Sequence, residues 1–190
     1  MLAAAADVFS RNGYASSSID DIALAAGVTR ATIYYHFASK ESIYTSIVVA
    51  YATDWRQRVE STLAGSSTCP AKKLAALMHD LVAATLDPRT KRLHYDQYIR
   101  ISESSREIIR SAQHAFSTAL ATVITEAQHE GQAHPGDARF LGLAVFEAIG
   151  RVPVWYNFDG RVGVAEAAQT LSTFFLRGFL TSEGMRHALE

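Results

Sequence analysis

Hydrophobic residues recur three and four positions apart along most of the chain, the spacing that places them on one face of an α-helix. A first helix is predicted over residues 2–12, and a long one runs from Lys40 to about Leu63. Pro70 opens another helix after a polar linker at residues 65–68. The chain has only four prolines and few β-branched runs, so the pattern predicts an all-α fold.

The second half of the chain continues this helical pattern. Ser104, followed three residues later by Glu107, predicts a capping box at the start of a further helix. Asp137 is predicted to cap the next helix, over residues 137–156, and a last helix covers residues 164–180. The apolar faces of these last two helices are too wide for a single core.

Residues 17–40 carry the most specific local pattern. A short amphipathic helix ends at Gly27, which suits a left-handed turn position, and Thr29 can cap a second helix. The predicted buried face of the first of these helices consists of Ile19, Ile22, Ala23 and Ala26. The second helix exposes hydrogen-bonding side chains, namely Arg30, Thr32, Tyr34, Tyr35 and His36. This profile is typical of a helix-turn-helix whose recognition helix binds DNA.

The run GVTRATIYYHFASKESIY, from Gly27 to Tyr44, resembles the DNA-binding domain of the TetR-type (TetR/AcrR) transcriptional regulators, and the resemblance extends back to Phe9. It implies a three-helix helix-turn-helix DNA-binding domain over residues 1–45 and a helical ligand-binding and dimerisation domain over residues 46–190. It also implies a ligand-responsive repressor. Such a protein binds palindromic operator DNA as a homodimer and is released by a small-molecule effector.

The side chains of the recognition helix allow alternative contacts. Arg30 can bond bidentately to a guanine in the major groove, or it can contact a phosphate. Thr32 can offer its methyl group to a thymine or its hydroxyl to a base edge or phosphate. Tyr35 either joins this surface or packs under the helix. One of the serines at positions 16–18 is expected to cap the preceding helix.

The resemblance implies further contacts with DNA. Tyr34 and His36 match positions that touch the DNA backbone, and Ser17 or Ser18 matches a position that touches a phosphate. Lys40 opens a helix, where its charge opposes the helix dipole, so we expect an anion such as a phosphate to bind there. The predicted DNA-binding set is therefore Ser17, Ser18, Thr29, Arg30, Thr32, Tyr34, Tyr35, His36 and Lys40.

The charge of this region differs from the basic footprint of most nucleic-acid binders. The whole chain has a net charge of −1, and residues 1–50 hold more acids than bases. Asp20 and Asp21 are expected to favour a helix dipole, while Arg30 and Lys40 face phosphate. TetR-type relatives usually carry a basic segment before the first helix, whereas the chain begins inside it. We therefore expect weak non-specific affinity for DNA and dependence on a dimer.

Composition sets the remaining bounds. The 190 residues suffice for one or two domains with a substantial core, and 48% of them are hydrophobic. No apolar run approaches eighteen residues and the N-terminus lacks a basic start, so we expect a cytoplasmic protein without a membrane span or signal peptide. Cys69 is the single cysteine, which excludes an internal disulfide and a cysteine-based zinc site.

The resemblance also places an effector among the central helices. Arg151 and Trp155 lie four residues apart, on one helical face that flanks Pro153. Their segment, GRVPVWYNFDG, is similar to a stretch of TetR-type regulators that respond to acyl-CoA thioesters. Alternatively, Trp155 belongs to the core and Arg151 pairs with an acid. Further candidate lining residues, with core or surface positions as the alternative, are His79, Tyr95, Tyr98 and Phe116.

In TetR-type regulators the last two helices pair with their twofold mates in a four-helix interface. The resemblance therefore implies an interface that contains Phe140, Phe174, Phe175 and Phe179. Dimerisation also suits DNA geometry, because two recognition helices about 34 Å apart read a palindrome.

Catalytic motifs are absent from the sequence. The histidines show no HExxH spacing, and there is neither a GxSxG motif nor a glycine-rich phosphate loop after a strand, so we expect no enzyme, cofactor or metal site. Residues 89–102 are basic, but nearby acids offset them, which favours a solvated face over a nucleic-acid patch. The alternative function is a helical DNA-binding or interaction protein without a small-molecule ligand. A filled interior favours this alternative, whereas a cavity of about 300 to 1,000 Å³ favours an effector.

Overall fold

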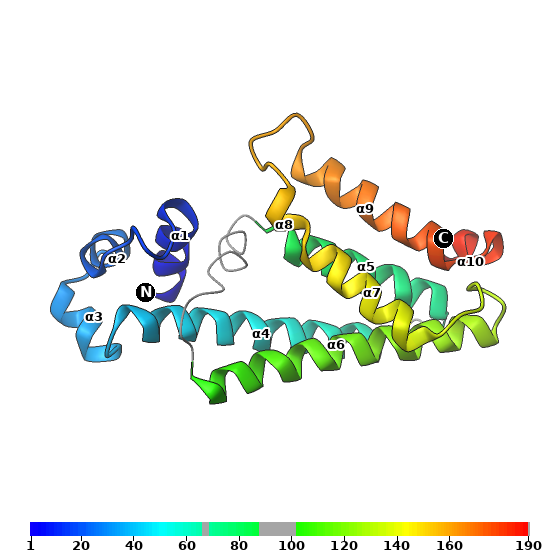
Figure 1. The fold of residues 1–190 in the computed structure, drawn as a ribbon, viewed down its shortest axis with the longest axis horizontal. Coiled ribbons are helices and arrows are strands. Elements are labelled where there is room, and N and C mark those ends of the chain that lie inside the picture. Colours follow the sequence, from blue (N-terminus) through cyan, green and yellow to red (C-terminus); the bar gives the residue numbers. More distant parts are fainter. Residues whose placement is uncertain (66–68, 88–101, 190) are drawn as a thin grey trace.

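The computed structural model describes residues 1–65, 69–87 and 102–189. In these ranges the regular elements are α-helices, and an isolated bridge between Ala133 and Leu180 is the only β-pairing. The predicted all-α fold is therefore confirmed. Figure 1 shows a small group of helices at one end of a long helix and a larger helical bundle along the rest of it.

The small group consists of α1 (Leu2–Asn12), α2 (Ile19–Ala26) and α3 (Arg30–His36), packed on the start of α4. Its core is a separate cluster of buried residues, made of Ala5, Ala6, Val8, Phe9, Ile19, Ile22, Ala23, Ile33, Ile43, Tyr44 and Ile47. Helices α1, α2 and α4 each supply several of these residues and α3 supplies Ile33, so none of the four helices buries its apolar side chains without the others.

Helix α4 (Lys40–Ala64) belongs to both cores. Ile43 and Ile47, near its start, lie in the small core, whereas Val59, near its end, lies in the core of the larger bundle. It packs alongside α6 (Glu103–His129) over a long stretch (Figure 1). Helix α4 therefore joins the small group of helices to the larger bundle.

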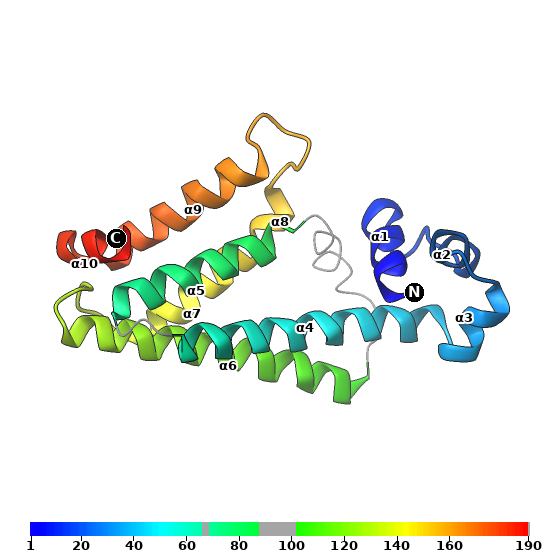
Figure 2. The same ribbon diagram turned by 180° about the vertical axis from the view of Figure 1, so that it is seen from behind.

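Helix α5 (Pro70–Thr85) is the centre of the larger bundle, and it contacts α4, α6, α7, α9 and α10. Figure 2 shows α5 and α7 (Ala138–Gly150) between the α4–α6 pair and α9 (Val164–Phe179). The large apolar residues of α5 are all buried, namely Leu74, Leu77, Met78, Leu81 and Val82, and so is Ala71. A helix covered on several sides is expected to be apolar around most of its circumference.

The predicted helix over residues 137–156 is two helices. Asp137 caps α7 as predicted, with the Phe140 backbone N–H donating to its carboxylate at 2.9 Å. However, α7 ends at Gly150, and a four-residue helix, α8 (Val152–Trp155), follows. Pro153 accounts for the break, because its ring cannot donate a backbone hydrogen bond and clashes with the carbonyl four residues earlier.

The chain after α9 turns into a short helix, α10 (Ser182–Leu189), which the hydrophobic pattern did not predict. Thr181 begins it by accepting a hydrogen bond from the Gly184 backbone N–H at 3.2 Å, and its own N–H donates to the Gln132 carbonyl at 2.9 Å. Gly184 packs against the backbone of Gln132, where a Cβ atom would overlap the carbonyl. These contacts fix the end of α9 on the bundle.

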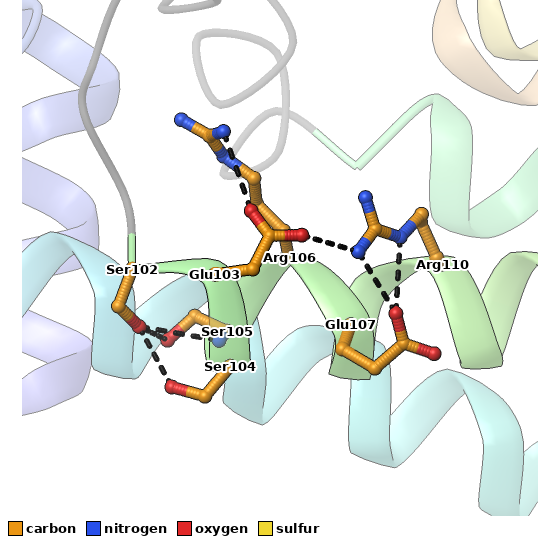
Figure 3. A network of polar contacts seen from close by, with 7 residues as sticks. All are labelled: Ser102, Glu103, Ser104, Ser105, Arg106, Glu107 and Arg110. Carbon is orange, nitrogen blue, oxygen red and sulfur yellow. Dashed lines mark hydrogen bonds and ion pairs between the residues drawn. The ribbon is translucent and has the colours of Figure 1, made fainter.

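The cap of helix α6 lies two residues before the predicted one. Ser102 caps it, because its hydroxyl accepts a hydrogen bond from the Ser105 backbone N–H at 3.2 Å. The predicted cap, Ser104, is wrong, and its hydroxyl lies 3.0 Å from that of Ser102 (Figure 3). The serine run offers several capping residues, so local pattern alone does not choose among them.

Four charged residues form a network on the outer face of this helix start (Figure 3). Arg110 pairs with Glu103 at 2.6 Å and with Glu107 at 2.8 Å, and Arg106 lies 3.6 Å from Glu103. The hydrogen bond from Arg110 is the main cause that lowers the pKa of Glu103. These exposed pairs, three to seven residues apart, stabilise the first turns of α6 without contacting another helix.

Candidate nucleic-acid interface

The turn between α2 and α3 is fixed by three local features. Gly27 has φ 65°, in the left-handed region that favours glycine, as its place in the sequence predicted. The Val28 backbone N–H donates to the Ala23 carbonyl at 3.0 Å, which completes the end of α2. The Thr29 hydroxyl accepts a hydrogen bond from the Thr32 backbone N–H at 3.1 Å, so the predicted cap of α3 is confirmed.

Helix α3 is only seven residues long and buries one of them completely. Ile33 lies in the small core, while Tyr34 and His36 are exposed and Tyr35 is 85% exposed. The alternative in which Tyr35 packs under the helix is therefore wrong. The Tyr35 ring instead meets the His36 ring edge-on, with centroids 5.0 Å apart. The helix presents aromatic and hydrogen-bonding groups outward, the side-chain types that contact bases and phosphates.

The start of α2 contains a complete capping box. The Ser18 hydroxyl accepts from the Asp21 backbone N–H at 3.1 Å, and the Asp21 carboxylate accepts from the Ser18 backbone N–H at 2.8 Å. Hydrogen bonds from the Ser18 hydroxyl and backbone lower the pKa of Asp21. The prediction that one serine caps this helix is confirmed, and the serine is Ser18.

Ser17 is placed differently from its prediction. Its side chain is only 4% exposed, and its hydroxyl donates to the Gly13 carbonyl at 2.6 Å. The hydroxyl proton that a phosphate contact would need is therefore already used in a hydrogen bond within the turn between α1 and α2. The structure thus turns Ser17 inward, whereas Ser18, at the start of α2, is the serine that faces outward.

Arg30 is held by two neighbours. Its Nη1 donates to Asp20 Oδ2 at 2.9 Å, and its Nη2 lies 3.4 Å from the Tyr34 hydroxyl. The guanidinium carbon is 5.5 Å from the centre of the Tyr34 ring. The Tyr34 hydroxyl, and then the Asp20 carboxylate, raise the pKa of Arg30. Sequence reasoning assigned Asp20 to the dipole of α2 and missed this pair, because the partners lie ten residues apart on two helices.

Lys40 has an internal role that its position did not reveal. Its ammonium donates to the Tyr14 and Ser17 carbonyls, both at 2.8 Å, and lies 4.4 Å from the centre of the Tyr14 ring. These two carbonyls, rather than a phosphate, account for a lysine at the start of α4. A phosphate contact by Lys40 stays a prediction, because an ammonium has three donors and one of them remains for DNA.

Thr32 sits at the edge of the same surface. Its side chain is half-buried, and its hydroxyl lies 2.9 Å from the Thr29 hydroxyl. The two threonines therefore form a small hydrogen-bonding pair at the start of α3. Of the nine predicted DNA-binding residues, Ser18, Thr29, Arg30, Thr32, Tyr34, Tyr35, His36 and Lys40 come together on or beside α3 and the adjoining helix starts.

The predicted effector residues are not brought together. His79 is exposed on α5, and Arg151 and Trp155 lie at the surface around α8, with Trp155 65% exposed. The alternative in which Trp155 belongs to the core is therefore also wrong. Tyr95 and Tyr98 lie outside the described residues.

Phe116 is the predicted effector residue that lies in the interior. Its ring is fully buried, 5.0 Å from the Trp55 ring and 5.6 Å from the Phe146 ring, centre to centre. These contacts join α4, α6 and α7. Phe116 is thus a core residue, which was the stated alternative for it.

An apolar surface covers α7 and α9. Phe140 is 71% exposed and Phe174 is 70% exposed, whereas Phe175 is half-buried against the core and Phe179 is buried in it. A groove of about 950 Å³ runs between the two helices, lined by Leu141, Ala144, Val145, Ala148, Gln169, Thr170, Thr173, Phe174, Phe175, Arg177, Gly178 and Phe179. The exposed phenylalanines fit the predicted interface, whereas Phe179 faces the core.

The described part of the chain offers neither a metal site nor a membrane-spanning helix. Within it, no group of three or more His, Cys, Asp or Glu side chains is placed to hold a metal ion. None of the described helices combines the length and the apolar character that a membrane crossing requires.

A helix-turn-helix with a polar recognition surface, joined by one long helix to a larger helical bundle, is the architecture of a DNA-binding transcriptional regulator. Residues 1–47 match the family described as bacterial regulatory proteins, tetR family. Residues 67–179 match the family described as tetracyclin repressor-like, C-terminal domain. The chain therefore belongs to the TetR family of transcriptional regulators, as its motif predicted.

Characterised relatives align with nearly the whole chain. The chain is 22% identical over 191 residues to the transcriptional repressor KstR2 of Mycolicibacterium smegmatis, covering 99% of this chain and 93% of that protein. It is 26% identical over 187 residues to the fatty acid metabolism regulator of Bacillus subtilis, covering 92% and 91%. A shorter match, 34% identical over 67 residues, joins it to the repressor DhaR of a Mycobacterium species and covers 35% of this chain and 34% of that one. These relatives are regulators of transcription rather than enzymes.

Solved structures share the fold. KstR2 of Mycobacterium tuberculosis superposes with a TM-score of 0.78 at 21% identity, covering 95% of this chain and 93% of that one. FadR of Bacillus subtilis, in complex with stearoyl-CoA, gives 0.71 at 23% identity, covering 93% and 96%. AibR, in complex with isovaleryl coenzyme A and operator DNA, gives 0.73 at 20% identity, covering 91% and 94%.

Proposed function

We propose that this protein is a repressor that binds palindromic operator DNA as a homodimer and is released by a small apolar effector. The surface of α3 carries the proposal. Arg30, Tyr34, Tyr35 and His36 project from a short helix that Ile33, Gly27 and the Thr29 cap hold rigidly in place. A recognition helix needs this combination, because base contacts are specific only when the backbone that presents them is fixed.

The exposed face of α7 and α9 supports the dimer. Phe140, Leu143 and Phe174 are large apolar side chains of these two helices that remain exposed in the single chain, and Phe174 also lines the groove of about 950 Å³. Such a contiguous apolar patch marks an interaction surface. A second copy seated on it by a twofold axis pairs two α3 helices, and helices about 34 Å apart read the two halves of a palindrome.

Two observations support an acyl-CoA-type effector. Two solved neighbours of the same fold hold coenzyme A thioesters, stearoyl-CoA in one and isovaleryl coenzyme A in the other. In this chain, the hydroxyl of Ser172 on α9 is buried and has no hydrogen-bond partner among the described residues. A bound molecule with a polar group would satisfy it, since a buried hydroxyl without a partner costs free energy. An effector releases DNA only if it binds one conformation better than the other.

A regulator without an effector is the second candidate. The observation that favours it is the filled interior around Phe116, which is fully buried between aromatic rings. Two grooves formed by described residues, of about 950 and 550 Å³, both open at the surface.

The deciding experiment is selection from a randomised duplex library at two salt concentrations, followed by sequencing of the retained DNA. Enrichment of a palindrome is the expected result, and loss of its retention when stearoyl-CoA or isovaleryl-CoA is added would establish the effector class. Enrichment that neither thioester disturbs would favour a regulator with another effector or none. Absence of any enriched sequence would contradict the proposed DNA-binding function.

A further inference from the structure

The ion pair between Arg30 and Asp20 differs from the other ion pairs of the described chain. The others join residues of one helix, as Arg58 and Asp54 do on α4 at 2.8 Å. Arg30 and Asp20 instead connect α3 to α2, at 2.9 Å. Both side chains remain well exposed, 58% for Arg30 and 64% for Asp20. The pair therefore lies open on the surface that the proposed function assigns to DNA.

The two contacts of Arg30 hold its guanidinium from two directions. Asp20 binds Nη1 from α2, and the Tyr34 hydroxyl approaches Nη2 from one turn later on α3. The guanidinium also lies over the Tyr34 ring, at 5.5 Å from its centre. A guanidinium has five N–H donors in a rigid fork, so these contacts leave further donors to face outward. The guanidinium of Arg30 is therefore already oriented in the protein without DNA.

From this geometry we propose that Asp20 is a positioning residue that sets sequence specificity by holding Arg30 toward the base edges and away from phosphate. The inference rests on the proposed DNA-binding function and deepens it. A bidentate contact with a guanine uses the outward donors of the fork and leaves the bond to Asp20 in place. A swing of Arg30 toward a phosphate breaks that bond and brings the phosphate near the Asp20 carboxylate. Non-specific binding therefore loses a contact that specific binding keeps.

The same pair explains the slightly acidic helix-turn-helix. Sequence-independent affinity comes from cations that neutralise phosphates. Asp20 withdraws Arg30 from this role, so the chain relies less on general attraction to DNA and more on base contacts. An acid on this surface thus raises the ratio of specific to non-specific affinity, the quantity that matters when many competing sites are present.

The test compares Asp20→Asn with Asp54→Asn at one fixed salt concentration. Both variants remove one negative charge and one exposed ion pair to arginine, but Asp54 lies on α4 and pairs within its own helix. The Kd is measured for the selected palindrome and for a scrambled duplex, with thermal unfolding as a check on folding. Asp20→Asn is expected to tighten binding to the scrambled duplex about 1.4- to fivefold, the fold-change that corresponds to the energies measured for exposed ion pairs. Its specificity ratio falls, whereas Asp54→Asn leaves that ratio unchanged.

An Arg30→Ala background separates positioning from simple repulsion of DNA. If Asp20 acts through Arg30, adding Asp20→Asn to Arg30→Ala does not change the ratio of specific to non-specific affinity further. The conservative variant Asp20→Glu, made in the wild-type protein, keeps most of the wild-type ratio. The same fall in the ratio without Arg30, or equal behaviour of Asp20→Asn and Asp54→Asn, overturns the inference and leaves the proposed function standing. A wild-type protein that shows no sequence preference overturns both.

Discussion

Two surfaces of this protein expose aromatic side chains to water, and they differ in what surrounds those rings. On α3, Tyr35 is 85% exposed and lies beside His36. On α9, Phe174 is 70% exposed and borders an apolar groove. A tyrosine keeps a hydroxyl in water, whereas a phenylalanine offers water nothing to bond. Similar exposure therefore indicates different partners, a polar and charged one for α3 and a second apolar surface for α9.

The two surfaces also differ in how they are supported. Helix α3 rests on one fully buried residue, Ile33, and on the caps and turn before it. Helices α7 and α9 rest on the large core, to which Val145 and Leu176 belong. A short helix held by a few contacts loses its geometry when one of them is removed. A long helix on a continuous core tolerates changes on its outer face.

The largest expected effect comes from the residue under the recognition helix. Ile33→Ala removes a fully buried side chain from the small core and should lower the free energy of unfolding by about 2 to 5 kcal/mol. Tyr35→Ala, two residues away on the exposed face, should change stability by less than about 0.5 kcal/mol while it weakens DNA binding. Urea unfolding and DNA titration measure the two quantities. Equal destabilisation by both variants would contradict the inward and outward division of α3.

A charge added to the apolar surface of α7 and α9 should disrupt the proposed dimer. Phe174→Glu places a carboxylate in the proposed dimer interface and should weaken self-association on the order of 100-fold or more, since central aromatic residues dominate interfaces. Gln113→Glu, on an exposed position of α6, adds the same charge elsewhere and serves as the control. Sedimentation velocity over a range of concentrations measures the association. A Phe174→Glu protein that remains dimeric would place the interface on another surface.

A substitution of Lys40 tests whether a residue beside the DNA-binding surface also stabilises the folded domain. Lys40→Met removes two hydrogen bonds to the Tyr14 and Ser17 carbonyls and should cost about 1 to 3 kcal/mol of stability. Affinity should fall for all DNA sequences alike, because the turn before α2 loses its anchor. Chemical denaturation and titration with the two duplexes measure this. Unchanged stability would show that the lysine serves phosphate instead.

The smallest effect concerns the cap of α2. Hydrogen bonds from Ser18 lower the pKa of Asp21 below its ordinary 3.8, so the carboxylate stabilises the folded state above that pH. The contribution is lost as the pH falls through the lower, folded-state pKa. Asp21→Asn should therefore lower the Tm slightly at pH 7, and the difference should shrink progressively as the pH falls below 3.8. In a Ser18→Ala background the difference at pH 7 should shrink, and a difference that persists unchanged would exclude the capping box as its cause.

Local features were predictable because their causes lie within a few residues. The left-handed Gly27, the Thr29 cap and the Asp137 cap each follow from a side chain or backbone conformation that acts on its immediate neighbours. The sequence motif around Gly27 and Thr29 also predicted membership of the TetR family. Failures of local prediction had local causes too, since Ser102 and Ser104 compete for one cap and Pro153 splits a helix that hydrophobic spacing continued.

The sequence by itself determined the helical fold, the helix-turn-helix and the polar character of α3, because periodicity, capping and glycine conformation are properties of short segments. Tertiary structure alone decided the roles of residues whose partners lie far away. It turned Ser17 inward, gave the Lys40 ammonium two carbonyls, paired Arg30 with Asp20 and left Trp155 at the surface. Each of these outcomes depends on where two helices cross. That crossing is set by the shape of the whole core rather than by the spacing of residues along either helix.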